Sequence, residues 1–180
     1  MTDIMIDLET FSTKYNASIL TIGAIKFNRK GPILPLEELD TFYCRIDKES
    51  CKAIKLHFDP KIISWWEKQD DDCKYEVFTD EGRIPIRDAL KDLAKWIGPN
   101  KKIWGHGSVF DCAILNNAYT ECKLETPWKF WDIRDTRTIY DIGNVNFNNI
   151  LYNNKHHALH DAYRQIIALK IAFDNLHKDI

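Results

Sequence analysis

The order of hydrophobic and polar positions predicts three β-strands at the beginning of the chain. Residues 4–9 form an apolar run that contains two acids near its end, and residues 19–27 form a second run with β-branched side chains. Runs of this kind are typical of buried strands. Residues 41–46 predict a third strand, after a loop that contains a glycine and two prolines. Three consecutive strands indicate a meander.

The middle of the chain carries the signals of two helices. Asp59 followed by Pro60 is a typical helix start, an acid at the N-cap and a proline at the first helical position, and it predicts a helix that reaches Glu67. We expect the acidic residues 70–72 to close this helix as a solvated loop. Apolar side chains at helical spacing over residues 86–97 predict a second helix, which a Gly-Pro pair ends.

In the second half of the chain, strand and helix signals alternate. Residues 102–105 predict a short strand, and the helix after it, which Ser108 can cap, runs through Asp111. The last long helix begins near His156 and carries Asp161 in its first turns. No repeat, linker or composition break divides the chain. We therefore predict an α/β fold, a mixed β-sheet flanked by α-helices.

The composition predicts one globular domain over residues 1–180. Hydrophobic residues at 44% and charged residues at 29% exclude a disordered or collagen-like chain. No run approaches the roughly 18 apolar residues of a membrane helix, and acids occupy the place where a signal peptide needs an apolar core. We therefore expect no membrane partner and a cytoplasmic location, or the host cytoplasm if the chain is viral.

Cysteine content and net charge narrow the chemistry further. The five cysteines include no C-x-x-C pair, which predicts reduced structural thiols rather than a disulfide framework or a zinc knuckle. A formal net charge of -2 gives no general attraction to phosphate, so any nucleic-acid contact should be short and local. Metal ions in an acidic pocket would supply the missing positive charge.

Four acids lie where predicted elements begin or end. Asp7 and Glu9 close the first strand, Asp111 opens a helix, and Asp161 lies in the first turns of the last helix. Positions i and i+2 of a strand share a face, so Asp7 and Glu9 can direct two carboxylates into one pocket. Hard oxygen ligands of this kind suit Mg²⁺ or Mn²⁺. A D-x-E pair taken alone is more often solvated than functional.

Three segments in order turn this weak signal into a specific one. Residues 7–10 match D-x-E-T, and residues 156–161 match H-x-x-x-x-D. Residues 106–111 match H-N-x-x-F-D at every fixed position except Gly107. These segments resemble the motifs of the DEDDh exonucleases, the superfamily of proofreading exonuclease subunits, RNase T and oligoribonuclease. Gly107 departs from the pattern, because many relatives have asparagine there, and that side-chain contact to the substrate is not carried over.

Two further segments resemble a narrower branch of this superfamily. Residues 59–69 and 128–138 are similar to the phage DexA-type and exonuclease VIII-like proteins and to mycobacterial-type exoribonucleases. With them the resemblance spans nearly the whole chain. It implies an RNase H-like fold, 3′-to-5′ exonuclease activity and, for several relatives, a homodimer.

The resemblance also implies roles for the acids and for one histidine. Asp7 would bridge two divalent cations, Mg²⁺ or Mn²⁺. Glu9 and Asp161 would complete one metal site, and Asp111 would hold the other directly or through water. His156 would take the proton from the attacking water, because imidazole titrates near working pH.

The substrate implied is the 3′ end of RNA or DNA, and no motif fixes the preferred sugar. By resemblance His106 and Phe110 would line the pocket of the terminal nucleotide, and Thr10 would offer a backbone amide near the cleaved end. Trp66 has two interpretations. It would stack on a base, which is worth about 1–3 kcal/mol, or it would belong to the core, as tryptophans on helices more often do.

Several neighbouring residues carry alternatives. His157 lies four residues before Asp161 and is a second candidate for the general base, although the motif favours its neighbour. Arg134 and Arg137 would either contact phosphate or form a structural ion-pair network, and the sequence does not separate the two interpretations.

Two other function classes remain open at this point. His156, His160 and Asp161 on one helix also fit an HD-type metal phosphohydrolase or a zinc site. That interpretation leaves the D-x-E strand without a role. A catalytically silent nucleic-acid-binding module would keep the fold and bind a strand end without cleaving it.

Overall fold

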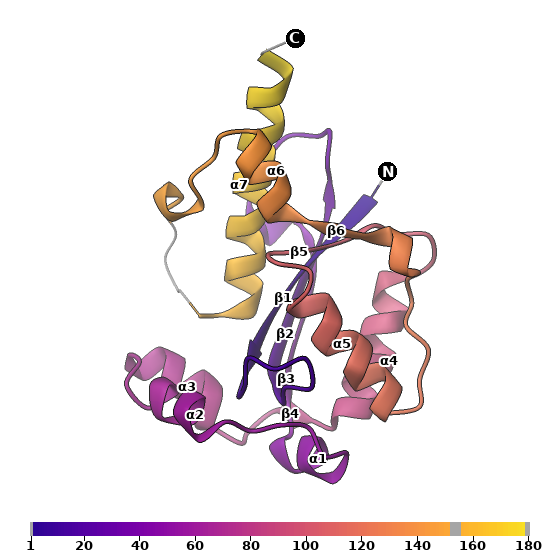
Figure 1. The fold of residues 1–180 in the computed structure, drawn as a ribbon, viewed down its shortest axis with the longest axis vertical. Helices are drawn as coiled ribbons and strands as arrows, with labels where there is room; N and C mark the ends of the chain where they lie inside the picture. Colours follow the sequence, from indigo (N-terminus) through magenta and orange to yellow (C-terminus); the bar gives the residue numbers. More distant parts are fainter. Residues whose placement is uncertain (1, 152–155, 179–180) are drawn as a thin grey trace.

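The computed structural model describes residues 2–151 and 156–178. In this part of the chain, six strands form one mixed sheet in the order β4-β3-β2-β1-β5-β6 (Figure 1). The strands are β1 (Thr2–Thr10), β2 (Ile19–Asn28), β3 (Asp40–Ile46), β4 (Arg83–Ile84), β5 (Ile103–Gly105) and β6 (Ile133–Asp135). Strands β1, β2 and β3 pair antiparallel, which confirms the predicted meander, whereas β5 joins β1 in parallel.

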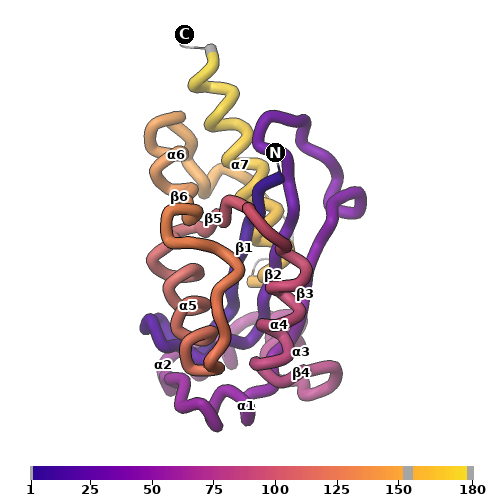
Figure 2. Tube along the Cα trace, turned by 90° about the vertical axis from the view of Figure 1, so that its right-hand side faces the viewer, coloured from indigo at the N-terminus to yellow at the C-terminus, as the bar shows by residue number. Residues whose placement is uncertain are grey.

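Helices cover both faces of this sheet. They are α1 (Lys48–Ala53), α2 (Pro60–Trp66), α3 (Asp71–Phe78), α4 (Ile86–Ile97), α5 (Asp111–Glu121), α6 (Thr136–Ile142) and α7 (Ala158–Lys178). Helices α6 and α7 lie on one face, and α4 and α5 lie on the other, as the two perpendicular views show (Figures 1 and 2). The predicted mixed sheet with flanking helices is therefore confirmed.

The alternation of side chains along β1 divides the core into two layers. Ile4, Ile6 and Leu8 point into the layer beneath α4 and α5. Met5 points to the opposite face and packs in the layer beneath α6 and α7. Because the strand period is two residues, Asp7 lies on the same face as Met5. Strand alternation thus directs the first acid toward α7.

Two local predictions were wrong. Residues 70–72 do not form a loop, because Asp70 is the N-cap of α3 and its carboxylate accepts a hydrogen bond from the amide of Cys73 at 2.9 Å. Acids at a helix N-terminus are stabilised by the helix dipole. Ser108 does not cap α5, since its hydroxyl donates to Asp135 at 3.1 Å and the N-cap position belongs to Phe110.

The cysteine side chains are thiols in this structure. All five cysteines are free, and four of them are buried. Within residues 2–151 and 156–178, no helix is both long enough and apolar enough to cross a membrane.

Candidate active site

A glycine on β2 allows the last helix to reach the acidic end of β1. Gly23 pairs with Asp7 across the antiparallel ladder. A Cβ at Gly23 would lie 2.3 Å from the carbonyl carbon of Ala158, a distance no side chain tolerates. The start of α7 therefore rests directly on the sheet beside Asp7. This contact carries Asp161 into the neighbourhood of Asp7 and Glu9.

A second glycine makes room for Asp111. A Cβ at Gly105 would lie 3.1 Å from Oδ2 of Asp111, tighter than ordinary contact. Asp111 is 2% exposed, and the backbone groups of Leu8 and His106 lie close enough to lower the pKa of its carboxyl against the effect of burial. The third acid is therefore fixed at the junction of β1, β5 and α5.

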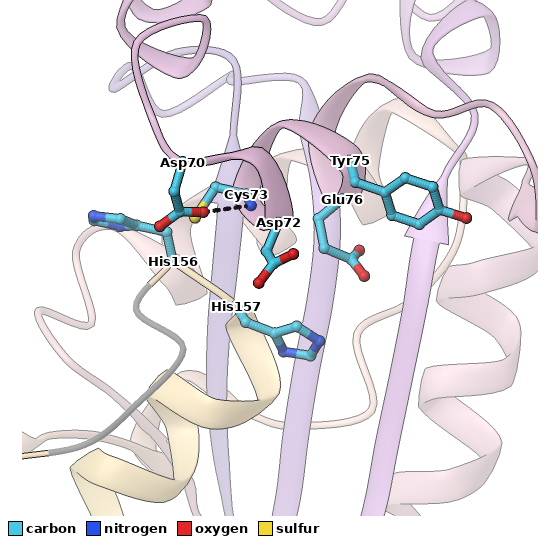
Figure 3. Close-up of a pocket in the computed structure, with 7 residues that line it drawn as sticks. All are labelled: Asp70, Asp72, Cys73, Tyr75, Glu76, His156 and His157. Atoms are coloured by element: carbon cyan, nitrogen blue, oxygen red, sulfur yellow. Dashed lines mark hydrogen bonds between the residues drawn. The ribbon is translucent and has the colours of Figure 1, made fainter.

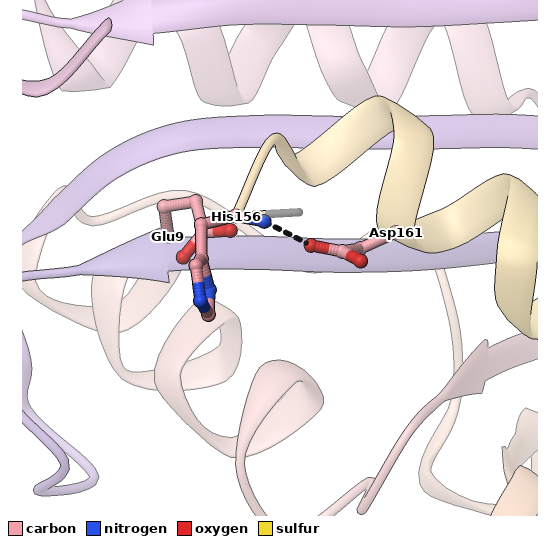
Figure 4. Close-up of side chains that lie close together, drawn as sticks. All are labelled: Glu9, His156 and Asp161. Atoms are coloured by element: carbon pink, nitrogen blue, oxygen red, sulfur yellow. Dashed lines mark hydrogen bonds between the residues drawn. The ribbon is translucent and has the colours of Figure 1, made fainter. Parts of the chain in front are cut away.

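His156 and Asp161 close the site from the side of α7. The His156 amide donates to Oδ2 of Asp161 at 2.8 Å, and His156 adopts a left-handed backbone conformation with φ of 63° (Figure 4). Ligand atoms of Glu9, His156 and Asp161 all lie within 4.8 Å of one another. The imidazole also meets the edge of Trp65 at 5.0 Å between ring centroids. The structure thus brings His156 to two of the four acids.

The four carboxyl groups oppose one another's ionisation. Burial raises the pKa of Asp7 well above its usual value, and the charges of Asp111, Glu9 and Asp161 raise it further. Burial, followed by the charges of Asp161 and Asp111, likewise raises the pKa of Glu9. Burial raises the pKa of Asp111 to about 7, and it also raises the pKa of Asp161. Buried acids whose ionisation is opposed in this way favour binding of a cation, because the positive charge would stabilise the ionised carboxylates.

This arrangement predicts how stability depends on pH in EDTA. A carboxyl whose folded pKa lies near 7 keeps its proton in the folded state between about pH 4 and pH 7, so its contribution to stability is lost as the pH rises. Asp111→Asn removes that loss. As the pH rises across this window, the melting temperature of Asp111→Asn should therefore increase relative to that of the wild type. We expect an increase of at least about 2–4 °C, which corresponds to roughly 1 kcal/mol in the free energy of unfolding.

The comparison with the variant is needed because two histidines act in the opposite direction. Burial lowers the pKa values of His106 and His157, so their contribution to stability grows as the pH rises. These histidines are present in both proteins and cancel in the difference. Scanning calorimetry at pH 4.5 and pH 7.5 measures the difference in melting temperature between the variant and the wild type. The same difference at both pH values would contradict the raised pKa of Asp111.

Gln165, which the sequence analysis did not single out, holds Asp7. Its Nε2 donates to Oδ1 of Asp7 at 2.6 Å, and the side chain is 2% exposed. The Gln165 carbonyl in turn accepts a hydrogen bond from the Tyr140 hydroxyl at 2.8 Å. Gln165 lies one helical turn beyond Asp161, and this spacing was the available signal.

Gln165→Leu should weaken metal-supported activity without unfolding the domain. Leucine keeps most of the buried volume but leaves the Asp7 carboxylate without its donor. Loss of a group that orients a metal ligand typically costs about 10–100-fold in metal affinity or activity. A titration of Mn²⁺ against the hydrolysis rate tests this, with a thermal melt as the control for folding. An unchanged half-saturating Mn²⁺ concentration and rate would show that Asp7 needs no such support.

His157 does not belong to the group of ligand atoms formed by Glu9, His156 and Asp161 among the described residues. Its ring stacks on Tyr43 with centroids 4.6 Å apart and lines a pocket of about 490 Å³ beside α3, near Asp72 and Glu76 (Figure 3). Burial lowers its pKa, and the nearby His160 lowers it further. The arrangement places His156, rather than His157, beside Glu9 and Asp161.

Trp66 is a core residue, which corrects its interpretation as a stacking surface. It is 2% exposed, and its indole N–H donates to the carbonyl of Thr10 at 3.0 Å. A buried ring offers no face to a base. Thr10 itself is buried, and its hydroxyl donates to the carbonyl of Ser12 at 2.6 Å. Of the two adjacent tryptophans, Trp65 is the exposed one, at 41%.

His106 and Phe110 lie on the side of the site formed by β5 and α5. The His106 ring packs against Phe147 with centroids 4.5 Å apart, and Nδ1 lies 3.0 Å from the hydroxyl of Thr136. Burial and the charge of a nearby arginine lower the pKa of His106 to about 4. Phe110 is partly buried against the α4 and α5 layer of the core. A role for either in binding a nucleotide stays a prediction.

The mixed sheet, with buried acids gathered at one end of β1 and helices on both faces, is the architecture of a nuclease domain. The chain belongs to the family described as the 3′-5′ exoribonuclease Rv2179c-like domain, whose model matches residues 2–173. It is accordingly a 3′-to-5′ exonuclease domain. The predicted resemblance to the DEDDh superfamily is confirmed.

Individual relatives differ in the nucleic acid that their names mention. An exodeoxyribonuclease of Enterobacteria phage T4 is 25% identical over 162 residues, 77% of this chain and 70% of the relative. Escherichia coli exonuclease I, in a zinc-bound complex with single-stranded DNA, superposes with a TM-score of 0.67 at 17% identity. That match covers 98% of this chain but only 43% of exonuclease I.

A second solved structure matches at nearly full length. The nuclease domain of 3′hExo, a DEDDh family member bound to rAMP, superposes with a TM-score of 0.59 at 17% identity. The match covers 98% of this chain and 92% of that domain. These structural likenesses establish a shared fold, and the expected RNase H-like architecture is confirmed.

Proposed function

We propose that this domain removes nucleotides from the 3′ ends of RNA or of single-stranded or overhanging DNA by hydrolysis supported by two divalent cations. The convergence of four mutually opposed carboxyls, Asp7, Glu9, Asp111 and Asp161, at one end of the sheet carries this proposal. Burying so many acids together is costly unless cations neutralise them.

The residues present fit two hard cations such as Mg²⁺ or Mn²⁺. Asp7 is central, since the charges of the other three acids all raise its pKa, and it would contribute to both metal sites. Glu9 and Asp161 would complete one site, and Asp111 would serve the other. Bound cations of this kind act as Lewis acids on phosphodiester oxygens and lower the pKa of bound water.

The chain's own groups supply orientation and proton transfer. Gln165 fixes the Asp7 carboxylate through its 2.6 Å hydrogen bond. His156, whose backbone amide donates a hydrogen bond to Asp161 and whose ring packs against Trp65, would accept the proton of the attacking water. The backbone of Thr10, anchored by the indole of Trp66, would meet the terminal nucleotide.

The names of the relatives support both RNA and DNA as substrate classes. The family is described as exoribonucleases, whereas the phage relative is an exodeoxyribonuclease. We carry forward RNA and DNA as substrate classes, and a homodimer, as proposals that rest on resemblance. A cytoplasmic location is a proposal that rests on the sequence pattern.

The deciding experiment is a time course on 5′-labelled and 3′-labelled oligonucleotides of RNA and of DNA, with Mn²⁺, Mg²⁺ or EDTA. The proposal predicts a metal-dependent ladder that shortens from the 3′ end and identifies the preferred sugar. Release of the 5′ label first, or intact strands in every condition, would contradict it. Tight binding without cleavage would favour the silent binding module instead.

A second candidate is a single-metal hydrolase in which His156 is a ligand. The proximity of Glu9, His156 and Asp161, with ligand atoms within 4.8 Å, favours it specifically. A nitrogen ligand beside two carboxylates suits zinc. Stoichiometric zinc, with activity lost in His156→Ala but kept in Asp111→Ala, would support this candidate over the two-cation site.

A further inference from the structure

The guanidinium of Arg137 occupies the space above Gly107. A Cβ at Gly107 would lie 2.9 Å from Cζ of Arg137, closer than carbon atoms approach. Gly107 also has φ of 90°, a conformation that favours glycine. Any side chain at this position would displace the arginine. Many relatives have an asparagine at this position. In this chain the position is glycine, and the guanidinium of Arg137 fills the space that a side chain would need.

Asp135 fixes the arginine relative to the active-site loop. Its carboxylate accepts hydrogen bonds from the amides of Gly107 at 3.3 Å and Ser108 at 2.7 Å. The same carboxylate caps α6 by accepting from the amide of Arg137 at 2.9 Å. One side chain therefore joins the loop before Asp111 to the first turn of α6. Arg137 is held at the edge of the acidic site by this shared anchor.

Arg137 is an exposed residue. Across residues 2–151 and 156–178, no carboxylate lies within ion-pair distance of its guanidinium. Its field nevertheless lowers the pKa of His106 and opposes the rise in the pKa of Asp111. Arg134 differs, because its guanidinium donates to the carbonyls of Trp131 and Ile133, each at 2.8 Å.

We propose that Arg137 binds a backbone phosphate of the nucleic-acid strand beside Asp111, and that Gly107 is the residue that makes room for it. An unpaired guanidinium is suited to two parallel hydrogen bonds with phosphate oxygens. A chain with net charge -2 and a cluster of acids attracts phosphate only where a cation is placed locally. The inference rests on the proposed function, because it assigns a contact to that site.

Arg137→Gln tests the contact, with Arg134→Gln as the matched control for the lost charge. Binding of a fluorescent single-stranded oligonucleotide is measured in EDTA over a range of salt concentrations. Arg137→Gln should weaken binding about 10- to 100-fold and lower the slope of log affinity against log salt by about 1. Arg137→Lys should fall between the wild type and Arg137→Gln, because it keeps the charge but loses the paired donors. Arg134→Gln should remain close to the wild type.

A double-mutant cycle tests the role of Gly107. Gly107→Ala should impair binding in the wild type by displacing the guanidinium, but it should cost much less in the Arg137→Gln background. The backbone strain of alanine at φ of 90° is present in both backgrounds and cancels. Equal losses of affinity in the two backgrounds would show that Gly107 and Arg137 act independently. That result would overturn the role of Gly107 in the inference.

Hydrolysis assays with Mn²⁺ then locate the phosphate. A loss in kcat/KM on a nucleoside 5′-p-nitrophenyl phosphate, as well as on oligonucleotides, would place Arg137 at the scissile phosphate. A loss confined to oligonucleotides would place it at a neighbouring phosphate. Either result supports the contact.

Other outcomes would overturn the inference. If Arg137→Gln and Arg134→Gln have the same affinity and the same salt slope, Arg137 is an ordinary surface residue. A fall in kcat with unchanged binding and salt slope would indicate that it only organises Asp111. If the wild type cleaves nothing, the proposed function fails, while the binding measurements still decide the role of Arg137.

Discussion

Asp7→Asn should abolish metal-supported hydrolysis while leaving the domain folded. Asp7 lies at the centre of the acidic cluster, and asparagine keeps its size and an oxygen that can accept the Gln165 hydrogen bond. The loss of one anionic ligand removes several kilocalories per mole of charge stabilisation. At about 1.4 kcal/mol for each tenfold change, kcat should fall by roughly 10³-fold or more. Single-turnover rates of the purified variant in saturating Mn²⁺ measure the effect.

The same substitution should raise stability in EDTA. Burial and three neighbouring charges oppose ionisation of Asp7, so a neutral side chain removes part of that cost. We expect a higher melting temperature than that of the wild type at pH 7.5. Asp141→Asn, a substitution of an exposed acid on α6, is the control and should change neither quantity. An active Asp7→Asn protein would refute the assignment of this cluster as the catalytic site.

His156→Ala should lower kcat by about 10²- to 10⁴-fold, the usual cost of removing a general base. The imidazole lies with Glu9 and Asp161 at the edge of the site, and Trp65 holds it edge-on. His157→Ala is the matched control. That ring stacks on Tyr43 and lies outside the group formed by Glu9, His156 and Asp161 among the described residues, so its removal should leave kcat within a few-fold of the wild type.

A metal titration separates the two roles that His156 can have. A general base can be removed without changing the affinity for Mn²⁺, whereas loss of a ligand weakens it. We expect the variant to bind Mn²⁺ as the wild type does and to fail in the chemical step. Weaker binding of a single Mn²⁺ ion would instead identify His156 as a metal ligand. Loss of rate in His157→Ala, rather than in His156→Ala, would reverse the choice of base.

The parts of the site that the sequence predicts are those governed by local rules. The period of a strand places Asp7 and Glu9 together, and strong helix signals place Asp111 and Asp161 near helix starts. Asp59 caps α2 as its sequence indicates, with its carboxylate accepting from the amide of Lys61 at 2.9 Å. In these cases residues that are close in the sequence determine the geometry.

Other parts depend on contacts between distant segments, which a sequence pattern does not encode. The missing side chain of Gly23 matters only because α7 crosses β2 at that point. Gln165 gains its role only when α7 faces β1. Ser108 has the chemistry of a helix cap, yet Asp135 binds its hydroxyl from β6. Trp66, in turn, is covered by neighbouring apolar side chains and is therefore unavailable to a base.

The most direct test of the central claim is to locate Mn²⁺ by anomalous diffraction in crystals grown with Mn²⁺ and a nucleoside 5′-monophosphate. We predict two ions per chain, with Asp7 contacting both. Glu9 and Asp161 should complete one site, Asp111 should serve the other, and His156 should remain unbound. A single ion ligated by His156, or no ion at this end of the sheet, would contradict the account.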